Sequence, residues 1–282
     1  MERTGPTWLG TLLYPAAIVA LFLCLQVVAK SLGLPASHWP LFAAPWALLA
    51  LLLSLPSRLR RVWQEPSPWC RLGVVASPKE ALLALLRGWG KALALLAPIA
   101  VLLVSTGMAR WHPDLSLAEL VNALALGLGV GFAEELLFRG WLWGELALHL
   151  GRARGAIAQA VMFSLVHARS DLGMLPLLGL LGGLFLLGWA LALQRRADGG
   201  LLWGAVGLHG GLVGVWFALL QGGLVLGPHQ APPWLVGPGG ANPNPVGGML
   251  GWLGMTLLLL ALARSLRQQR VGGITDNARM CP

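Results

Sequence analysis

The chain has 282 residues, of which 56% are hydrophobic and only 11% are charged. Soluble domains carry about 25% charged residues, so this composition excludes an ordinary soluble globular protein. Leucine-rich stretches recur, several near the roughly 20 apolar residues that cross a ~30 Å hydrocarbon core. The formal net charge of +9 is typical of basic loops beside anionic headgroups, so we expect membrane lipids as partners and no nucleic acid.

Eight helical spans are expected along the chain, separated by turn segments rich in Gly, Pro, Asn and Asp. They cover residues 8–28, 40–56, 82–105, 117–148, 154–170, 174–193, 200–221 and 247–264. This pattern predicts an all-α fold, a polytopic membrane helical bundle of about eight transmembrane helices. We expect three N-terminal spans in residues 1–115, a helical core in 116–266 and a C-terminal tail in 267–282.

The distribution of Lys and Arg predicts how these spans are oriented. With eight spans, fourteen basic residues fall on the side of the two termini, and only Lys30, Arg110 and Arg169 on the other. Basic residues collect in cytoplasmic loops, so both termini and the tail are predicted to be cytoplasmic. We expect an integral protein of a bacterial inner or thylakoid-type membrane.

Ionisable side chains inside the expected spans are the candidate functional residues, because burying them in a membrane is costly. They are Glu134, Glu135 and Arg139 in the fourth span, His167 in the fifth and His209 in the seventh. Counting back to the expected cytoplasmic helix ends at ~1.5 Å per residue puts Glu134, His167 and His209 roughly 21, 20 and 15 Å deep. Three helices therefore present polar groups at a similar level, as an active site or an ion site requires.

The spacing within the fourth span separates the two glutamates. Glu135 precedes Arg139 by four residues, in the order that favours an intrahelical ion pair. Glu134 lies about 100° further round the helix, which leaves it as the candidate general base. The structural alternative is a neutralised pair that only anchors the helix. His167 and His209 are, taken separately, weak signals, because a lone histidine on an apolar helix face is more often a packing residue than a catalyst.

Three short motifs resemble those of a known family. Glu134-Glu135-Leu136-Leu137-Phe138-Arg139, then Phe163 with His167, then His209, follow the order of the motifs E-E-x-x-x-R, F-x-x-x-H and H-x-x-x-N. These motifs are typical of the CPBP family of intramembrane glutamic proteases, which includes type II CAAX prenyl endopeptidases and bacteriocin-processing or self-immunity proteins. The resemblance covers about Ser116 to Ala218.

The resemblance implies an eight-helix enzyme that hydrolyses a peptide bond with activated water and without a metal or covalent intermediate. By position, Glu134 and His167 would activate the water, Glu135 and Arg139 would support them, and His209 would stabilise the oxyanion. We therefore expect no cofactor, and a peptide or protein substrate that a CAAX-type member would take in lipidated form. The sequence identifies neither the substrate nor the oligomeric state.

The last motif position departs from the family pattern, because Val213 stands where Asn is usual. A valine side chain cannot donate a hydrogen bond to an oxyanion. Asn242 or Asn244, in a Pro-rich tract on the predicted external side, are the candidate substitutes.

Three other functions fit parts of the sequence. Val213 favours a catalytically inactive, CPBP-like scaffold or partner-binding protein. The buried carboxylates fit an ion-coupled transporter, although the inverted repeats and matched broken helices of that class are not evident. Two Glu and two His fit a zinc site, although no H-E-x-x-H helix occurs and Arg139 beside the glutamates disfavours an added dication.

Overall fold

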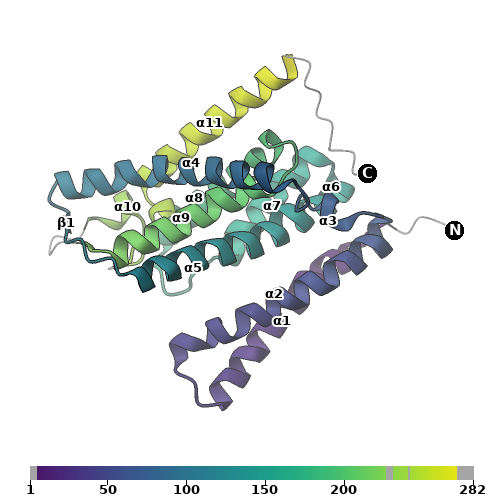
Figure 1. The fold of residues 1–282 in the computed structure, drawn as a ribbon, viewed down its shortest axis with the longest axis horizontal. Coiled ribbons are helices and arrows are strands. Elements are labelled where there is room, and N and C mark those ends of the chain that lie inside the picture. The colour runs from purple at the N-terminus through teal and green to yellow at the C-terminus, as the bar shows by residue number, and fades with distance from the viewer. Residues whose placement is uncertain (1–4, 227–230, 241, 272–282) are drawn as a thin grey trace.

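The computed structural model describes residues 5–226, 231–240 and 242–271. The α-helices of these residues are α1 (Trp8–Ser31), α2 (Trp39–Arg58), α3 (Pro68–Arg71), α4 (Pro78–Ser105), α5 (Leu117–Glu135), α6 (Trp143–Leu150), α7 (Arg152–Val166), α8 (Met174–Ala197), α9 (Trp203–Gln221), α10 (Pro233–Val236) and α11 (Met249–Val271) (Figure 1). Two short 3-10 helices are η1 (Ala36–His38) and η4 (Pro245–Gly247), and two π-helical segments are η2 (Leu59–Trp63) and η3 (Leu136–Leu142).

The predicted all-α membrane fold is confirmed. Within the described part of the chain, seven helices are long and apolar enough to cross a membrane, in rough agreement with the expected eight. The exception is the expected fifth span, because α7 has only 15 residues and ends at Val166. Helix α11 continues to Val271, and the rest of the predicted tail, 272–282, lies outside the described residues.

The early end of α7 has a local cause in His167. The ring Nδ1 of His167 lies 2.7 Å from the carbonyl oxygen of Phe163, and the backbone N–H of His167 donates to Ser164 instead. The side chain thus occupies the carbonyl that the next helical hydrogen bond would use. His167 therefore sits at the C-terminal cap of α7, where the sequence pattern had put it inside a longer helix.

A small antiparallel ribbon was not predicted. Strands β1 (Ala109–Trp111) and β2 (Leu224–Leu226) pair with Arg110 opposite Val225. Strands of three residues depend on their tertiary setting more than on a recognisable sequence pattern. The ribbon joins the chain after α4 to the chain after α9, and so ties these two neighbouring helices at one end.

Capping boxes fix where α4 and α5 begin. Ser77 accepts a hydrogen bond from the N–H of Glu80, whose carboxylate accepts from the N–H of Ser77. Ser116 and Glu119 repeat this reciprocal pair at the start of α5. Each box satisfies backbone donors that a helix N-terminus leaves open.

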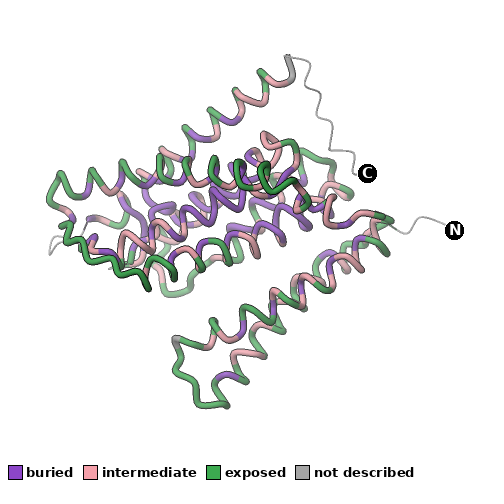
Figure 2. The backbone as a smooth tube through the Cα atoms, in the orientation of Figure 1, coloured by how far each residue is buried: buried purple, intermediate pink, exposed green. Residues whose placement is uncertain are grey.

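Helix α9 lies in the middle of the bundle and is the most enclosed of the seven long helices (Figure 2). Of the residues in its apolar 18-residue stretch, 61% are buried. It packs against α4 and α5 through glycines. A Cβ on Gly127 of α5 would lie 2.5 Å from the carbonyl oxygen of Gly210 in α9, and a Cβ on Gly131 would lie 2.9 Å from the same glycine's Cα. Only glycine permits the two backbones to come this close.

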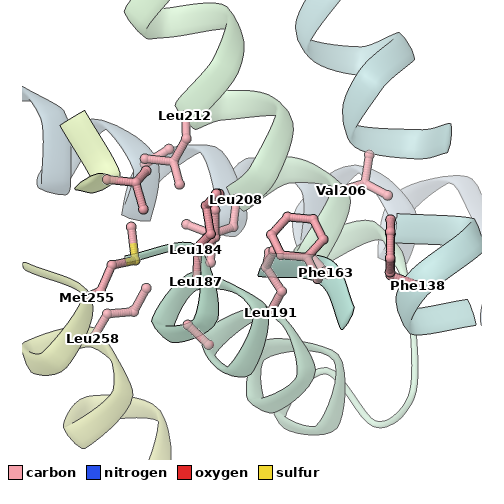
Figure 3. Packing of buried hydrophobic residues seen from close by; sticks show 14 of the residues in the cluster. Phe138, Phe163, Leu184, Leu187, Leu191, Val206, Leu208, Leu212, Met255 and Leu258 are labelled. Atoms are coloured by element: carbon pink, nitrogen blue, oxygen red, sulfur yellow. The ribbon is translucent and has the colours of Figure 1, made fainter. Parts of the chain in front are cut away.

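The apolar core fills the space between α7, α8, α9 and α11. Figure 3 shows Leu184 and Leu187 of α8 between Leu208 of α9 and Met255 of α11, with Leu191 further along α8 toward Phe163. Phe163 of α7 is 1% exposed and closes this cluster on the side of the candidate site. The site is therefore supported by a packed apolar layer.

The hairpin of α1 and α2 diverges from the bundle in Figure 1 and meets it near α3 and α6. At that end Glu145 of α6, which is fully buried, forms an ion pair with Arg58 of α2. Glu145 also accepts hydrogen bonds from Trp63 Nε1 at 2.9 Å and from Thr11 Oγ1 at 3.2 Å. Arg58, expected in a basic loop, thus anchors the hairpin to the helix that follows the site.

The close contact of α5 and α9 predicts opposite effects for two glycines on one helix. Gly127→Ala forces the helices apart and is expected to lower the free energy of unfolding by about 1–3 kcal/mol. Gly129 has nothing within 4 Å of its added Cβ, so Gly129→Ala should be neutral or stabilising by up to about 1 kcal/mol. Unfolding in mixed micelles measures both, and an equal effect of the two substitutions would contradict this packing.

Candidate functional site

The five candidate residues selected from the sequence come together at one place in the bundle. Glu134 and Glu135 end α5, Arg139 lies in the π-helical segment η3, His167 caps α7 and His209 lies in the middle of α9. Four chain segments thus contribute to one cluster. The similar depths inferred from helix lengths correspond to this convergence.

Glu135 is the centre of the buried half of the cluster. Its Oε1 accepts a hydrogen bond from Arg139 Nη1 at 2.8 Å and lies 2.8 Å from His209 Nδ1. The side chains of Glu135 and Arg139 are both fully buried, and that of His209 is 6% exposed. A buried carboxylate with two donors is neutralised and fixed in one orientation. The expected i,i+4 pair is present, and it also orients a histidine from another helix.

Glu134 occupies the more open half. Its Oε2 lies 3.4 Å from His167 Nε2 and 3.9 Å from His209 Nε2, beyond direct N–H···O bonding, which is commonest near 2.9 Å. The side chains of Glu134 and His167 are 28% and 33% exposed. One buried carboxylate oxygen therefore faces two imidazole nitrogens, in a side chain that is itself partly exposed.

The hydrogen bonds at Nδ1 fix the ring orientation of both histidines. A carbonyl oxygen only accepts, so Nδ1 of His167 carries the proton in its contact with Phe163. The carboxylate of Glu135 likewise accepts a hydrogen bond from the Nδ1–H of His209. In both rings Nε2 is then left for chemistry, and in both rings Nε2 faces Glu134.

Phe163 separates the site from the apolar core. Its ring lies 4.7 Å from the ring of His167 and meets the ring of His209 edge-on at 5.7 Å. The guanidinium of Arg139 lies over the same ring, 4.1 Å from its centroid. Such contacts stabilise a cation away from water by about 1–2 kcal/mol. One phenylalanine therefore supports three polar members of the cluster.

Val213 lies one helical turn after His209 on α9 and is half-buried. Among the suggested substitutes, Asn244 uses its Oδ1 to accept from the N–H of Val246 at 3.2 Å, capping η4, and Asn242 is exposed. In the described structure neither asparagine has a hydrogen bond to the five cluster residues. His209 is thus the residue of α9 whose side chain faces Glu134.

Two further polar residues near the site were missed. Glu145 lies inside the expected fourth span, so the rule that selected Glu134 could also have selected it. Arg195, at the end of α8, was assigned to a basic loop, yet it donates to the backbone carbonyl of Arg139. No sequence signal marks this second contact, because it depends on how α8 packs beside η3.

These features define the class of protein as a polytopic helical membrane protein whose core holds a glutamate–histidine cluster able to carry out acid–base chemistry. Among the described residues, no group of three or more His, Cys, Asp and Glu side chains is arranged to hold a metal ion.

Residues 115–215 match the family model described as type II CAAX prenyl endopeptidase Rce1-like, and this part of the chain is a domain of that family. The matched segment contains all five cluster residues and runs from the start of α5 to α9. No curated protein and no solved structure matches the chain.

The geometry predicts that the two glutamates differ in their contribution to stability. Glu135→Gln breaks a fully buried charge pair and is expected to lower the free energy of unfolding by about 3–5 kcal/mol. Glu134→Gln, in a side chain that is 28% exposed and whose Oε2 has no hydrogen-bond partner, should change it by less than about 1 kcal/mol. Unfolding of both variants in mixed micelles is the measurement, and a reversed order would contradict the assignment of roles.

Proposed function

We propose that the chain is an intramembrane endopeptidase of the CPBP type, which hydrolyses a peptide bond without a metal by means of a glutamate- and histidine-activated water. The observation that carries the proposal is the convergence of His167 Nε2 and His209 Nε2 on Glu134 Oε2. A carboxylate and an imidazole this close to each other can both reach one water and take its proton. The match to an endopeptidase family supports the same reaction.

The proposed steps use Oε2 of Glu134 and the Nε2 atoms of the two histidines. Glu134 and His167 accept a proton from the water, and its oxygen attacks the carbonyl carbon of the scissile bond. His209 donates through Nε2–H to the oxyanion that forms. The proton taken from the water then passes to the leaving amine, and the C–N bond breaks. Glu135 and Arg139 act through His209, because Glu135 holds its Nδ1–H.

The substrate is proposed to be a peptide or protein segment that reaches the membrane, in lipidated form if this domain shares the substrate class in its family's name. The partial exposure of Glu134 and His167 provides an approach for such a segment. We further propose that both termini are cytoplasmic, on the basis of the Lys and Arg distribution.

Glu134→Gln is expected to reduce cleavage about 100-fold or more, because it removes a general base without changing the shape of the side chain. The measurement is a comparison of membrane peptides from cells with wild type and variant, followed by cleavage of an identified peptide in vitro. Glu119→Gln, which makes the same change at the other end of α5 and keeps a residue able to cap it, is the control. Full cleavage by Glu134→Gln would contradict the proposal.

The second candidate is a catalytically inactive scaffold, which Val213 favours because the family's usual Asn is missing. A Glu134→Gln, His167→Ala double substitution separates the two. The endopeptidase proposal predicts that a cell lacking the gene is not rescued by the double variant at wild-type protein abundance. Complete rescue would instead establish the scaffold.

A further inference from the structure

Arg195 makes an unusual set of contacts for a residue at the end of a membrane helix. Its Nη1 donates to the carbonyl oxygen of Arg139 and lies 3.5 Å from that of Gly140. Its Nε donates to the carbonyl of Gly200 at 3.0 Å, and its Nη2 donates to that of Arg71 at 3.0 Å. One guanidinium thus donates hydrogen bonds to backbone carbonyls from three separate parts of the chain.

The carbonyls of Arg139 and Gly140 belong to the π-helical segment η3. In this segment the N–H of Trp143 donates to the carbonyl of Phe138, five residues earlier. Where such a five-residue pattern returns to the four-residue pattern of an α-helix, one carbonyl is passed over and needs another donor. The next carbonyl after that of Phe138 is that of Arg139, which is where Arg195 donates.

The π-helical register determines which way the site residues face. Ten residues separate Glu135 from Glu145, which would put them about 80° apart on a regular α-helix. With one residue inserted by the π-helical turn, the rotation between Glu135 and Glu145 equals that of nine α-helical residues, which puts the two side chains about 180° apart. This agrees with the contacts, because Glu135 meets His209 of α9 while Glu145 meets Arg58 of the α1–α2 hairpin.

We propose that Arg195 is a positioning residue that holds η3 in its π-helical register and thereby keeps Glu135, Arg139 and His209 in contact. Without its guanidinium, the passed-over carbonyl loses its donor and the return to a regular α-helix is favoured. That return rotates one end of the segment by about 100° relative to the other. Because Glu145 is anchored to the hairpin, the change falls on the Glu135 end.

The test uses the full chain in lipid nanodiscs with ¹⁵N-labelled histidine. The ring nitrogens of His209 are assigned with His209→Gln, and their shifts report whether Nδ1–H is bonded to Glu135. Arg195→Gln is expected to abolish the Glu135-bonded signature, whereas Arg195→Lys, with one ammonium for several carbonyls, should retain part of it. Arg60→Gln, which removes an exposed charge in η2, is the control and should leave the signature unchanged.

A second arm measures cleavage and rests on the proposed function. Arg195→Gln should lower kcat about 100-fold with KM changed by less than about twofold, and Arg195→Lys about tenfold. An unchanged His209 signature in a folded Arg195→Gln protein would overturn the inference. A lost signature in a chain whose wild type cleaves nothing would uphold the role of Arg195 and count against the peptidase instead.

Discussion

The structure of the site depends on a single oxygen atom, Oε1 of Glu135, which is shared by Arg139 and His209 at 2.8 Å each. Arg139 belongs to the same helical run as Glu135, but His209 comes from α9. The oxygen therefore joins a local ion pair to a long-range contact among buried side chains. An unpaired charge there would cost several kcal/mol, so the three side chains stabilise the fold only as a set. Glu134, which none of them binds directly, is left for chemistry.

This contact requires α5 and α9 to approach more closely than most side chains permit. Gly127 and Gly131 face Gly210 across the interface, and a Cβ on any of the three would meet backbone atoms. His209 directly precedes Gly210, so the closest approach of the helices coincides with the position of the histidine. The same small residues that explain packing between membrane helices thus set the distance from His209 to the glutamates. The glycine packing of α5 against α9 and the geometry of the site therefore depend on the same contacts.

The sequence predicted most of the long helices because composition and length suffice for that, and it predicted the cluster because ionisable residues inside apolar spans are rare. It failed where structure depends on hydrogen bonds between distant segments. The end of α7 is set by the His167 ring, and the β1–β2 ribbon joins residues more than a hundred positions apart. The π-helical turn after Glu135 is likewise invisible in the pattern, since its Leu, Phe, Arg and Trp residues also occur in α-helices and one glycine, Gly140, does not by itself mark a π turn.

The cluster combines carboxylates, a guanidinium and imidazoles in a poorly solvated place, where each charge needs a partner. Arg139 pairs with Glu135 at 2.8 Å, whereas Oε2 of Glu134 has no hydrogen-bond partner. His209 joins the two carboxylates, because its Nδ1 lies 2.8 Å from Glu135 Oε1 and its Nε2 lies 3.9 Å from Glu134 Oε2. His167 approaches the same oxygen of Glu134 from the end of α7, with its Nδ1 held by the carbonyl of Phe163. The geometry thus brings one carboxylate and two imidazoles together, and these are the side-chain types that the proposed addition of water to a carbonyl would use.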